Sequence, residues 1–136
     1  MRLTRSVLAL FAVGLLASVA SAADMKFEVY KDKADEFRWR LKGGNGEIVA
    51  TGGQGYKAKE DARKGLELLV KSDDKSKFEV YEDEKKEYRW RLKAGNNQVV
   101  AVSSEGYKEK AGAEKALKTV REGVAKAEVV DVKEEK

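Results

Sequence analysis

Few residue types in this sequence could do chemistry. The 136-residue chain contains neither histidine nor cysteine. This excludes imidazole and thiolate metal ligands, cysteine nucleophiles and the histidine base of a serine triad. Carboxylates, lysines and hydroxyls remain as candidate reactive groups, and we expect no cofactor and no metal site.

Three short stretches place such groups in loops. The acidic cluster Asp32, Asp35 and Glu36 lacks the alternating oxygen ligands and central glycine of a calcium loop. The pair Ser103-Ser104 has no base in sight, and the glycine-rich run 52–55 lacks the Lys-Ser/Thr ending of a phosphate loop. We therefore predict that the protein is not an enzyme; an enzyme that uses loop carboxylates or serine is the alternative.

The most suggestive pattern is a set of basic and aromatic residues that alternates with apolar residues. These residues share one face of the predicted strands: Arg38, Arg40, Lys42, Arg89, Arg91, Lys93, Tyr30 and Tyr81. Basic side chains interleaved with aromatic rings can hold a polyanion or single-stranded nucleic acid. Glu28 and Glu79 fall on the same face, where each could form a cross-strand ion pair with an arginine of its own hairpin. A binding platform and a self-neutralised structural ladder both stay open.

The two halves of this pattern are equivalent because the chain contains an internal duplication. The sequence KFEVY at 26–30 recurs at 77–81, and the offset of 51 residues then holds without a gap. About half of the aligned positions are identical, which indicates a tandem repeat. We place repeat 1 at about residues 26–76 and repeat 2 at about 77–132, in one domain that covers residues 23–136.

Each repeat predicts three strands and one helix. Apolar and polar residues alternate over 27–30 and 37–42, which is the period of a strand with one buried face, and a third strand covers 47–51. After residue 56 the apolar spacing becomes helical, with small residues that would let the helix lie close on a sheet. A last strand candidate covers 127–132 and could complete a shared sheet. We predict an α+β fold: a duplicated β3-α unit plus a C-terminal strand, in one antiparallel sheet with the helices packed on one face.

The turn between the second and third strands sets their register. Asn-Gly at 45–46 predicts a type I′ hairpin, in which both turn residues take positive φ. Pairing through this turn would set Leu41 beside Ala50. Ile48 and Ala50 would then share the face of Trp39.

The N-terminus has the features of a secretory signal peptide over residues 1–22. Arg2 and Arg5 precede an apolar run over 7–20, and the small residues at 20–22 suit cleavage at Ala22 or Ala23. The run is shorter than the roughly 20 residues that span a membrane. We therefore expect a periplasmic or secreted protein with no stable membrane span after processing. Cleavage would leave 26 basic against 24 acidic residues, a balance that gives little attraction to polyanions.

Together the motifs resemble the YegP-like family, small proteins of unknown function that occur as single units or tandem duplicates. The resemblance covers essentially the whole mature chain and is carried by the segments 27–30, 37–41, 45–46, 78–81, 88–92 and 103–107. It implies two β3-α units in a single antiparallel sheet, with the terminal strands exchanged between the halves, and it implies no established activity. Family members usually have Ser or Thr as the helix N-cap. Here Ala58 and Glu109 stand at that place, so both helices should begin without a side-chain cap.

The function expected from the sequence is that of an exported, non-catalytic binding or structural module of the cell envelope. An anionic ligand or a protein is a possible partner on the basic sheet face, and polyanion or nucleic acid binding is an alternative, although export argues against nucleic acid. Self-association is a third possibility, because a swapped terminal strand invites it.

Overall fold

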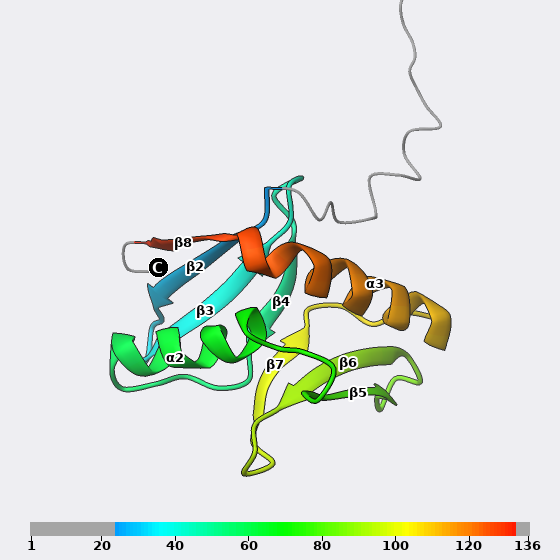
Figure 1. Ribbon diagram of the computed structural model, residues 1–136. Coiled ribbons are helices and arrows are strands. Elements are labelled where there is room, and N and C mark those ends of the chain that lie inside the picture. The colour runs from blue at the N-terminus through cyan, green and yellow to red at the C-terminus, as the bar shows by residue number, and fades with distance from the viewer. Residues whose placement is uncertain (1–23, 133–136) are drawn as a thin grey trace, which may run out of the picture.

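The structure, a computed structural model, describes residues 24–132 (Figure 1). The predicted signal peptide therefore lies outside the described residues. The elements follow in the order β2 (Lys26–Lys31), β3 (Phe37–Lys42), β4 (Ile48–Gly52), α2 (Lys59–Val70), β5 (Lys77–Glu82), β6 (Tyr88–Lys93), β7 (Val99–Ser103), α3 (Lys110–Gly123), the short 3-10 helix η2 (Val124–Lys126) and β8 (Glu128–Asp131). This order confirms two β3-α units and a C-terminal strand.

One seven-stranded sheet joins the two units, in the order β5-β6-β7-β4-β3-β2-β8. The units meet at the antiparallel pair β4 and β7 in the middle of the sheet. Every other neighbouring pair is antiparallel except β2 and β8, which run parallel. The sheet is thus mixed and mostly antiparallel: five of its six strand pairs are antiparallel as predicted, and the last strand, β8, is added in parallel.

The expected exchange of terminal strands occurs in one direction only. β8 belongs to repeat 2 and pairs with β2 of repeat 1, and its Asp131 accepts a hydrogen bond of 2.6 Å from Arg63 of α2. β5, which follows α2 as β8 follows α3, pairs with β6 of its own unit. The exchange is one-sided because β5 must serve both as the strand after the first helix and as the first strand of repeat 2.

The turn between β3 and β4 is not the predicted type I′ turn. Only its last residue, Gly46, is left-handed, with φ of 84°. The Gly46 N–H donates to the Gly43 carbonyl and the Gly43 N–H donates to the Glu47 carbonyl, each at 2.9 Å. This is the longer hairpin loop in which an ordinary turn is followed by one left-handed residue. Asn97, with φ of 71°, occupies the same place in repeat 2.

The prediction that Ile48 faces the core is wrong, because a β-bulge shifts the register between β3 and β4. Leu41 lies opposite Ala50 as expected, but Lys42 then lies opposite Ile48 and not opposite Val49. The extra residue turns Val49 toward the core, while Ile48 is 41% exposed. Sequence alternation cannot show such a shift, because it assumes one residue on each strand at every step.

Both helices pack on the face of the sheet that carries the two tryptophans. Trp39 and Trp90 are fully buried, and each meets a phenylalanine of the neighbouring strand edge to face. The buried residues of α2 are Ala62, Gly65, Leu66 and Leu69, and those of α3 are Ala113, Val120 and Gly123. Both helices begin without a side-chain cap, at the positions predicted. Among residues 24–132, none of the helices is long and apolar enough to cross a membrane.

Candidate functional site

The first group of predicted binding residues surrounds Glu28. Its carboxylate accepts a hydrogen bond of 2.7 Å from Arg40 Nε and lies 3.5 Å from Lys42 Nζ. The guanidinium of Arg40 also stacks over Tyr30, 4.4 Å from the ring centroid. Burial disfavours the charged form of Glu28, whose side chain is 9% exposed, but Arg40 and Lys42 outweigh this effect and hold its pKa below the usual value. The group is a compact cluster of one anion, two cations and one ring.

The second group repeats this arrangement around Glu79 in a more open setting. Arg91 Nε donates to Glu79 at 2.8 Å, Lys93 Nζ lies 3.3 Å away, and Arg91 stacks over Tyr81 at 4.2 Å. Hydrogen bonds from Arg91 and then Lys93 lower the pKa of Glu79. Its side chain is 42% exposed, against 9% for Glu28. The expected cross-strand ion pairs are thus confirmed for Arg40 and Arg91.

The remaining two arginines have partners that the sequence analysis missed. Arg38 Nε donates to Asp32 at 2.6 Å, and Arg89 Nε donates to Asp83 at 2.8 Å. Both aspartates also accept backbone N–H groups of their own turns, and these bonds, followed by the arginines, lower the pKa of each carboxyl. The repetition of an aspartate six residues before each arginine could have revealed this pair. Asp32 is therefore a turn-closing residue and not merely part of a solvated acidic cluster.

Every one of the six predicted cations has a carboxylate partner in the described part of the chain. An incoming anion would have to compete with these carboxylates for hydrogen bonds that are already made. In the middle of the sheet the two groups are separated by Thr51 and Val102, which lie opposite each other on β4 and β7. The geometry is that of a structural ladder, and ligand binding by this face stays a prediction.

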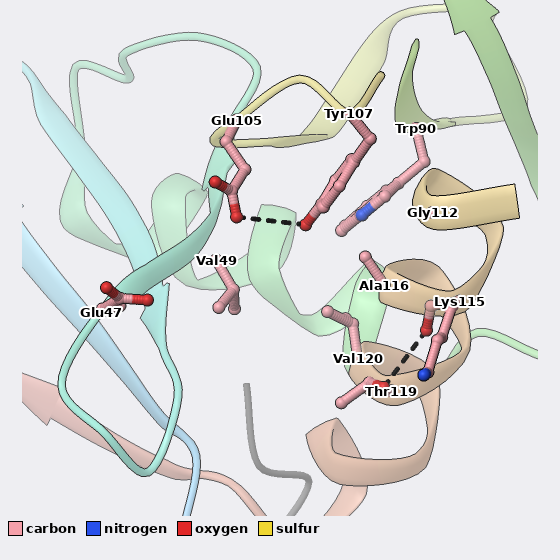
Figure 2. A pocket seen from close by; sticks show the side chains of 10 residues that line it. All are labelled: Glu47, Val49, Trp90, Glu105, Tyr107, Gly112, Lys115, Ala116, Thr119 and Val120. Carbon is pink, nitrogen blue, oxygen red and sulfur yellow. Dashed lines mark hydrogen bonds between the residues drawn. The ribbon is translucent and has the colours of Figure 1, made fainter. Parts of the chain in front are cut away.

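A pocket with a volume of about 180 Å³ lies on the opposite face, between α3, the β4 strand and the loop after β7 (Figure 2). Val49 and Glu47 of repeat 1 line one side, so the pocket straddles the junction of the two units. The residues of repeat 2 that line it are Trp90, Glu105, Tyr107, Gly112, Lys115, Ala116, Thr119 and Val120. Apolar and aromatic groups form most of its surface, and the charged side chains Glu47, Glu105 and Lys115 stand among them.

The pocket coincides with positions where repeat 2 carries smaller or differently shaped residues than repeat 1. Leu68 and Leu69 of α2 correspond to Thr119 and Val120 of α3 at the offset of 51. Leu69 is fully buried, so its replacement by valine removes a methylene from the space beneath the helix.

Helix α3 is also held farther from Tyr107 than α2 is from Tyr56. A methyl group at Gly65 would lie only 2.8 Å from Tyr56 Oη. Ala116 carries this methyl in repeat 2, so α3 and Tyr107 cannot approach as closely as α2 and Tyr56 do. Helix α2 therefore packs more closely on Trp39 than α3 packs on Trp90.

The indole N–H of Trp90 is buried without a hydrogen-bond partner, and Figure 2 shows the indole reaching into the pocket. An unsatisfied buried N–H costs about 1–3 kcal/mol and calls for an explanation. The indole N–H of Trp39 also lacks a partner, but methyl groups at Gly52 and Gly65 would lie 2.7 and 3.3 Å from it. Backbone therefore packs against Trp39, whereas a pocket lies against Trp90.

The hydroxyl groups near the pocket are already engaged. Tyr107 Oη lies 3.3 Å from a carboxylate oxygen of Glu105 and donates to it. Burial, the Glu105 charge and this bond raise the pKa of Tyr107 to about 12. The Ser103 hydroxyl accepts the Trp90 backbone N–H and donates to the Glu105 carbonyl.

In the described residues no group of three or more His, Cys, Asp or Glu could hold a metal ion.

This pocket was not predicted from the sequence, although Ser103 lies in one of the three candidate loops. The self-alignment contains the relevant difference. Gly65, Leu68 and Leu69 of α2 align with Ala116, Thr119 and Val120 of α3. The helical pattern alone treats these residues as equivalent core positions. Only the difference in their volumes indicates a cavity.

Comparison with known proteins identifies a family and relatives with similar sequences. The family model described as "Domain of unknown function (DUF1508)" matches residues 32–74 and 83–131, once in each unit. A UPF0339 protein encoded in the ptx operon 5′ region of Stutzerimonas stutzeri is 37% identical over 107 residues, which cover 78% of this chain and 95% of the relative. A UPF0339 protein of Treponema denticola matches over 47 residues at 49% identity, 79% of its own length.

Solved structures show the same fold. The solution structure of a UPF0339 protein from Shewanella oneidensis has a TM-score of 0.71 at 26% identity, and the match covers 81% of this chain and 92% of that chain. The solution structure of the protein of unknown function yegP from E. coli also has a TM-score of 0.71 at 26% identity, with coverage of 84% and 97%. The comparisons thus supply an architecture and no activity.

Proposed function

Since the chain belongs to the DUF1508 family of domains of unknown function, we propose from its own geometry that it is an exported, non-catalytic module that binds a small, mostly apolar molecule in the pocket beneath α3. The carrying observation is the buried, unpaired indole N–H of Trp90 at a pocket where Val120 of α3 stands in place of the fully buried Leu69 of α2. A ligand that displaces the atoms now covering this N–H and accepts a hydrogen bond from it would remove the cost of leaving it unsatisfied.

The size and lining of the pocket define the class of ligand. Its volume of about 180 Å³ suits a molecule slightly larger than benzene, since an apolar cavity of about 150 Å³ binds benzene. Val49, Ala116 and Val120 favour an apolar body, and Trp90 N–H favours a carbonyl or similar acceptor. The Glu47 and Glu105 carboxylates disfavour an anionic ligand near the rim. An uncharged aromatic amide or ketone combines these properties.

A non-catalytic role is supported by how the nearby reactive groups are used. The Ser103 hydroxyl is 2% exposed and holds the backbone of β6 and the following loop together. The phenol of Tyr107, with its raised pKa, stays protonated near neutral pH and is directed at Glu105. Neither group is poised as a nucleophile or base.

Isothermal titration with benzamide, and with toluene as the probe that lacks an acceptor, tests the proposal. We expect benzamide to bind with a Kd of about 1 mM or tighter and toluene to bind several-fold more weakly. The double variant Thr119→Leu/Val120→Leu gives α3 the residues of α2 and should weaken benzamide binding at least tenfold. Lys118→Leu is the matched control, because it adds the same side chain to α3 at a position that does not line the pocket. Failure of both probes to bind, or equal binding by the filled variant, would contradict the proposal.

Export rests on the N-terminal sequence and has its own test. The mass of the intact protein purified from its native compartment should correspond to a chain that begins at Ala23 or close to it. Recovery of the full-length chain from the cytosol would contradict export, and it would leave the binding proposal untouched.

A further inference from the structure

The outer edge of β5 is the place where the two units differ most in their partners. In repeat 1 the equivalent edge of β2 is covered by β8, with Phe27 opposite Val129 and Glu28 opposite Val130. Within residues 24–132 no strand lies beyond β5. As a result Phe27 and Val29 are at most 1% exposed, whereas Phe78 and Val80 are only partly buried. A strand edge with a half-covered apolar side is a template for a further strand.

The pairing in repeat 1 shows which backbone groups of β5 point outward. Glu128 N–H donates to the Met25 carbonyl and Val132 N–H donates to the Val29 carbonyl, so alternate residues of β2 face β8. At the offset of 51 the corresponding outward residues are Phe78 and Val80. Phe78 N–H already donates to the Ser76 carbonyl at 3.1 Å. Val80 therefore presents both a donor and an acceptor at the centre of the uncovered edge.

We propose that two copies of the chain associate by antiparallel pairing of their β5 strands, with Val80 of one copy opposite Val80 of the other. A two-fold axis normal to the sheet keeps the helices of both copies on the same side, and it lets the two Val80 residues exchange their outward hydrogen bonds. This register sets Phe78 opposite Glu82 of the second copy and Glu79 opposite Tyr81 of the second copy. Two neighbouring registers keep the same residues facing outward. One places Glu79 opposite Glu79 of the second copy, which repulsion disfavours, and the other leaves Phe78 opposite position 84, beyond the end of β5.

The charges along this edge are complementary to themselves. The guanidinium of Arg121 lies over the Phe78 ring, 5.2 Å from its centroid, and its present carboxylate partner is the exposed Asp74, at 3.2 Å. Glu82 of the second copy, opposite Phe78 on that face, would come within reach of Arg121, and symmetry makes this contact twice. On the other face Glu79 would approach the Tyr81 ring of the second copy, on which Arg91 is stacked at 4.2 Å.

The alternative occupant, a second copy's β8 added in parallel, fits the charges less well. In repeat 1, Asp131 of β8 is held by Arg63 at 2.6 Å and by Lys59 at 3.5 Å. Their counterparts on α3 are Glu114 and Lys110, so the stronger contact would become a repulsion. The geometry thus favours pairing of β5 with β5.

Sedimentation equilibrium of the chain from residue 23 onward, which contains every described element, tests this pairing. We expect a monomer–dimer equilibrium with a Kd of about 10–100 µM, as for a small interface. Glu82→Arg or Arg121→Glu alone should raise the Kd at least tenfold, and the double variant Glu82→Arg/Arg121→Glu should bring it back to within about threefold. Val120→Leu is the control, because it alters the pocket and leaves the β5 edge unchanged.

Amide hydrogen exchange gives a second readout on the unmodified chain. Exchange at the Val80 amide should slow as the protein concentration rises, while exchange at the Val29 amide, already beneath β8, should stay constant. A chain that remains monomeric up to about 1 mM, or a dimer that both single variants leave intact, would overturn the proposal.

Discussion

The two units carry nearly the same side chains in the same register, yet repeat 1 is covered and repeat 2 is open. Phe27 is fully buried and Glu28 is 9% exposed, while Phe78 is partly exposed and Glu79 is 42% exposed. The cause is a single strand, because β8 covers β2 and the described chain has no counterpart for β5. Burial at equivalent positions is therefore set by chain topology and not by residue identity, and equivalent mutations should have unequal effects.

The largest expected difference concerns the paired phenylalanines. Phe27→Ala should lower the free energy of unfolding by about 3–5 kcal/mol, because it removes a fully buried ring from beside Trp39. Phe78→Ala should cost about half as much, since part of that ring is already in water. Urea denaturation of both variants measures the two values, and equal losses would contradict the difference in burial.

The next difference concerns the two glutamates. Glu28→Gln should cost about 1.5–3 kcal/mol, because it weakens a mostly buried, charge-assisted hydrogen bond to Arg40. Glu79→Gln, on the exposed side, should cost clearly less, because water screens an exposed ion pair. Denaturation at neutral pH distinguishes the two. The comparison fails if the exposed glutamate proves the more important.

The same substitution should change the acid side of the stability profile. The pKa of Glu28 is below its ordinary value of 4.5 in the folded state, so folding favours the carboxylate. Its contribution is present above about pH 4.5 and is lost as the pH falls through the lower, folded-state pKa. Glu28→Gln should therefore flatten the fall of stability below pH 4.5, as measured by denaturation at several pH values. An unchanged acid limb would show that Glu28 is not paired when the protein is folded.

The helix starts should behave alike in the two units, because neither has a side-chain cap and both capping residues are extended. Ala58→Ser and Glu109→Ser should each raise the free energy of unfolding by about 1 kcal/mol. Thermal denaturation of the two variants measures the gains. A gain in one unit alone would show that another group already caps the other helix.

The smallest expected effect is an exchange of one methylene between the helices. Leu69→Val should lower the free energy of unfolding by about 1 kcal/mol, because it opens a space under α2. Val120→Leu should raise it by up to about 0.8 kcal/mol, because the pocket can receive the added methylene. A loss in Val120→Leu would mean that the space beneath α3 is too narrow for it.

Much of this fold followed from the sequence, because periodicity reports which side of a strand or helix is buried. The strands, the helices, their uncapped starts and an ion pair of Glu28 and of Glu79 with an arginine of its own hairpin were all predicted. The features that were not predicted depend on the pairing or the backbone conformation of a single residue. The bulge at Ile48 adds a residue to one strand, and the turn at Gly46 needs only one left-handed residue.

The candidate sites divide in the same way. The basic face was visible in the alternation of the strands, but its neutralisation by Asp32 and Asp83 depends on how each turn folds back. The pocket depends on differences of single methyl groups, such as Gly65 against Ala116, which a pattern of apolar positions does not weigh. The open edge of β5 depends on which unit receives the last strand.

The most direct test of the difference between the closely packed repeat 1 and the pocket in repeat 2 uses the only two tryptophans of the chain. Their indole N–H groups give two signals in a proton–nitrogen correlation spectrum, and Trp90→Phe assigns them. On titration with benzamide, the account predicts a downfield shift of the Trp90 signal and a stationary Trp39 signal. Equal shifts of both signals, or no shift of the Trp90 signal at millimolar benzamide, would contradict it.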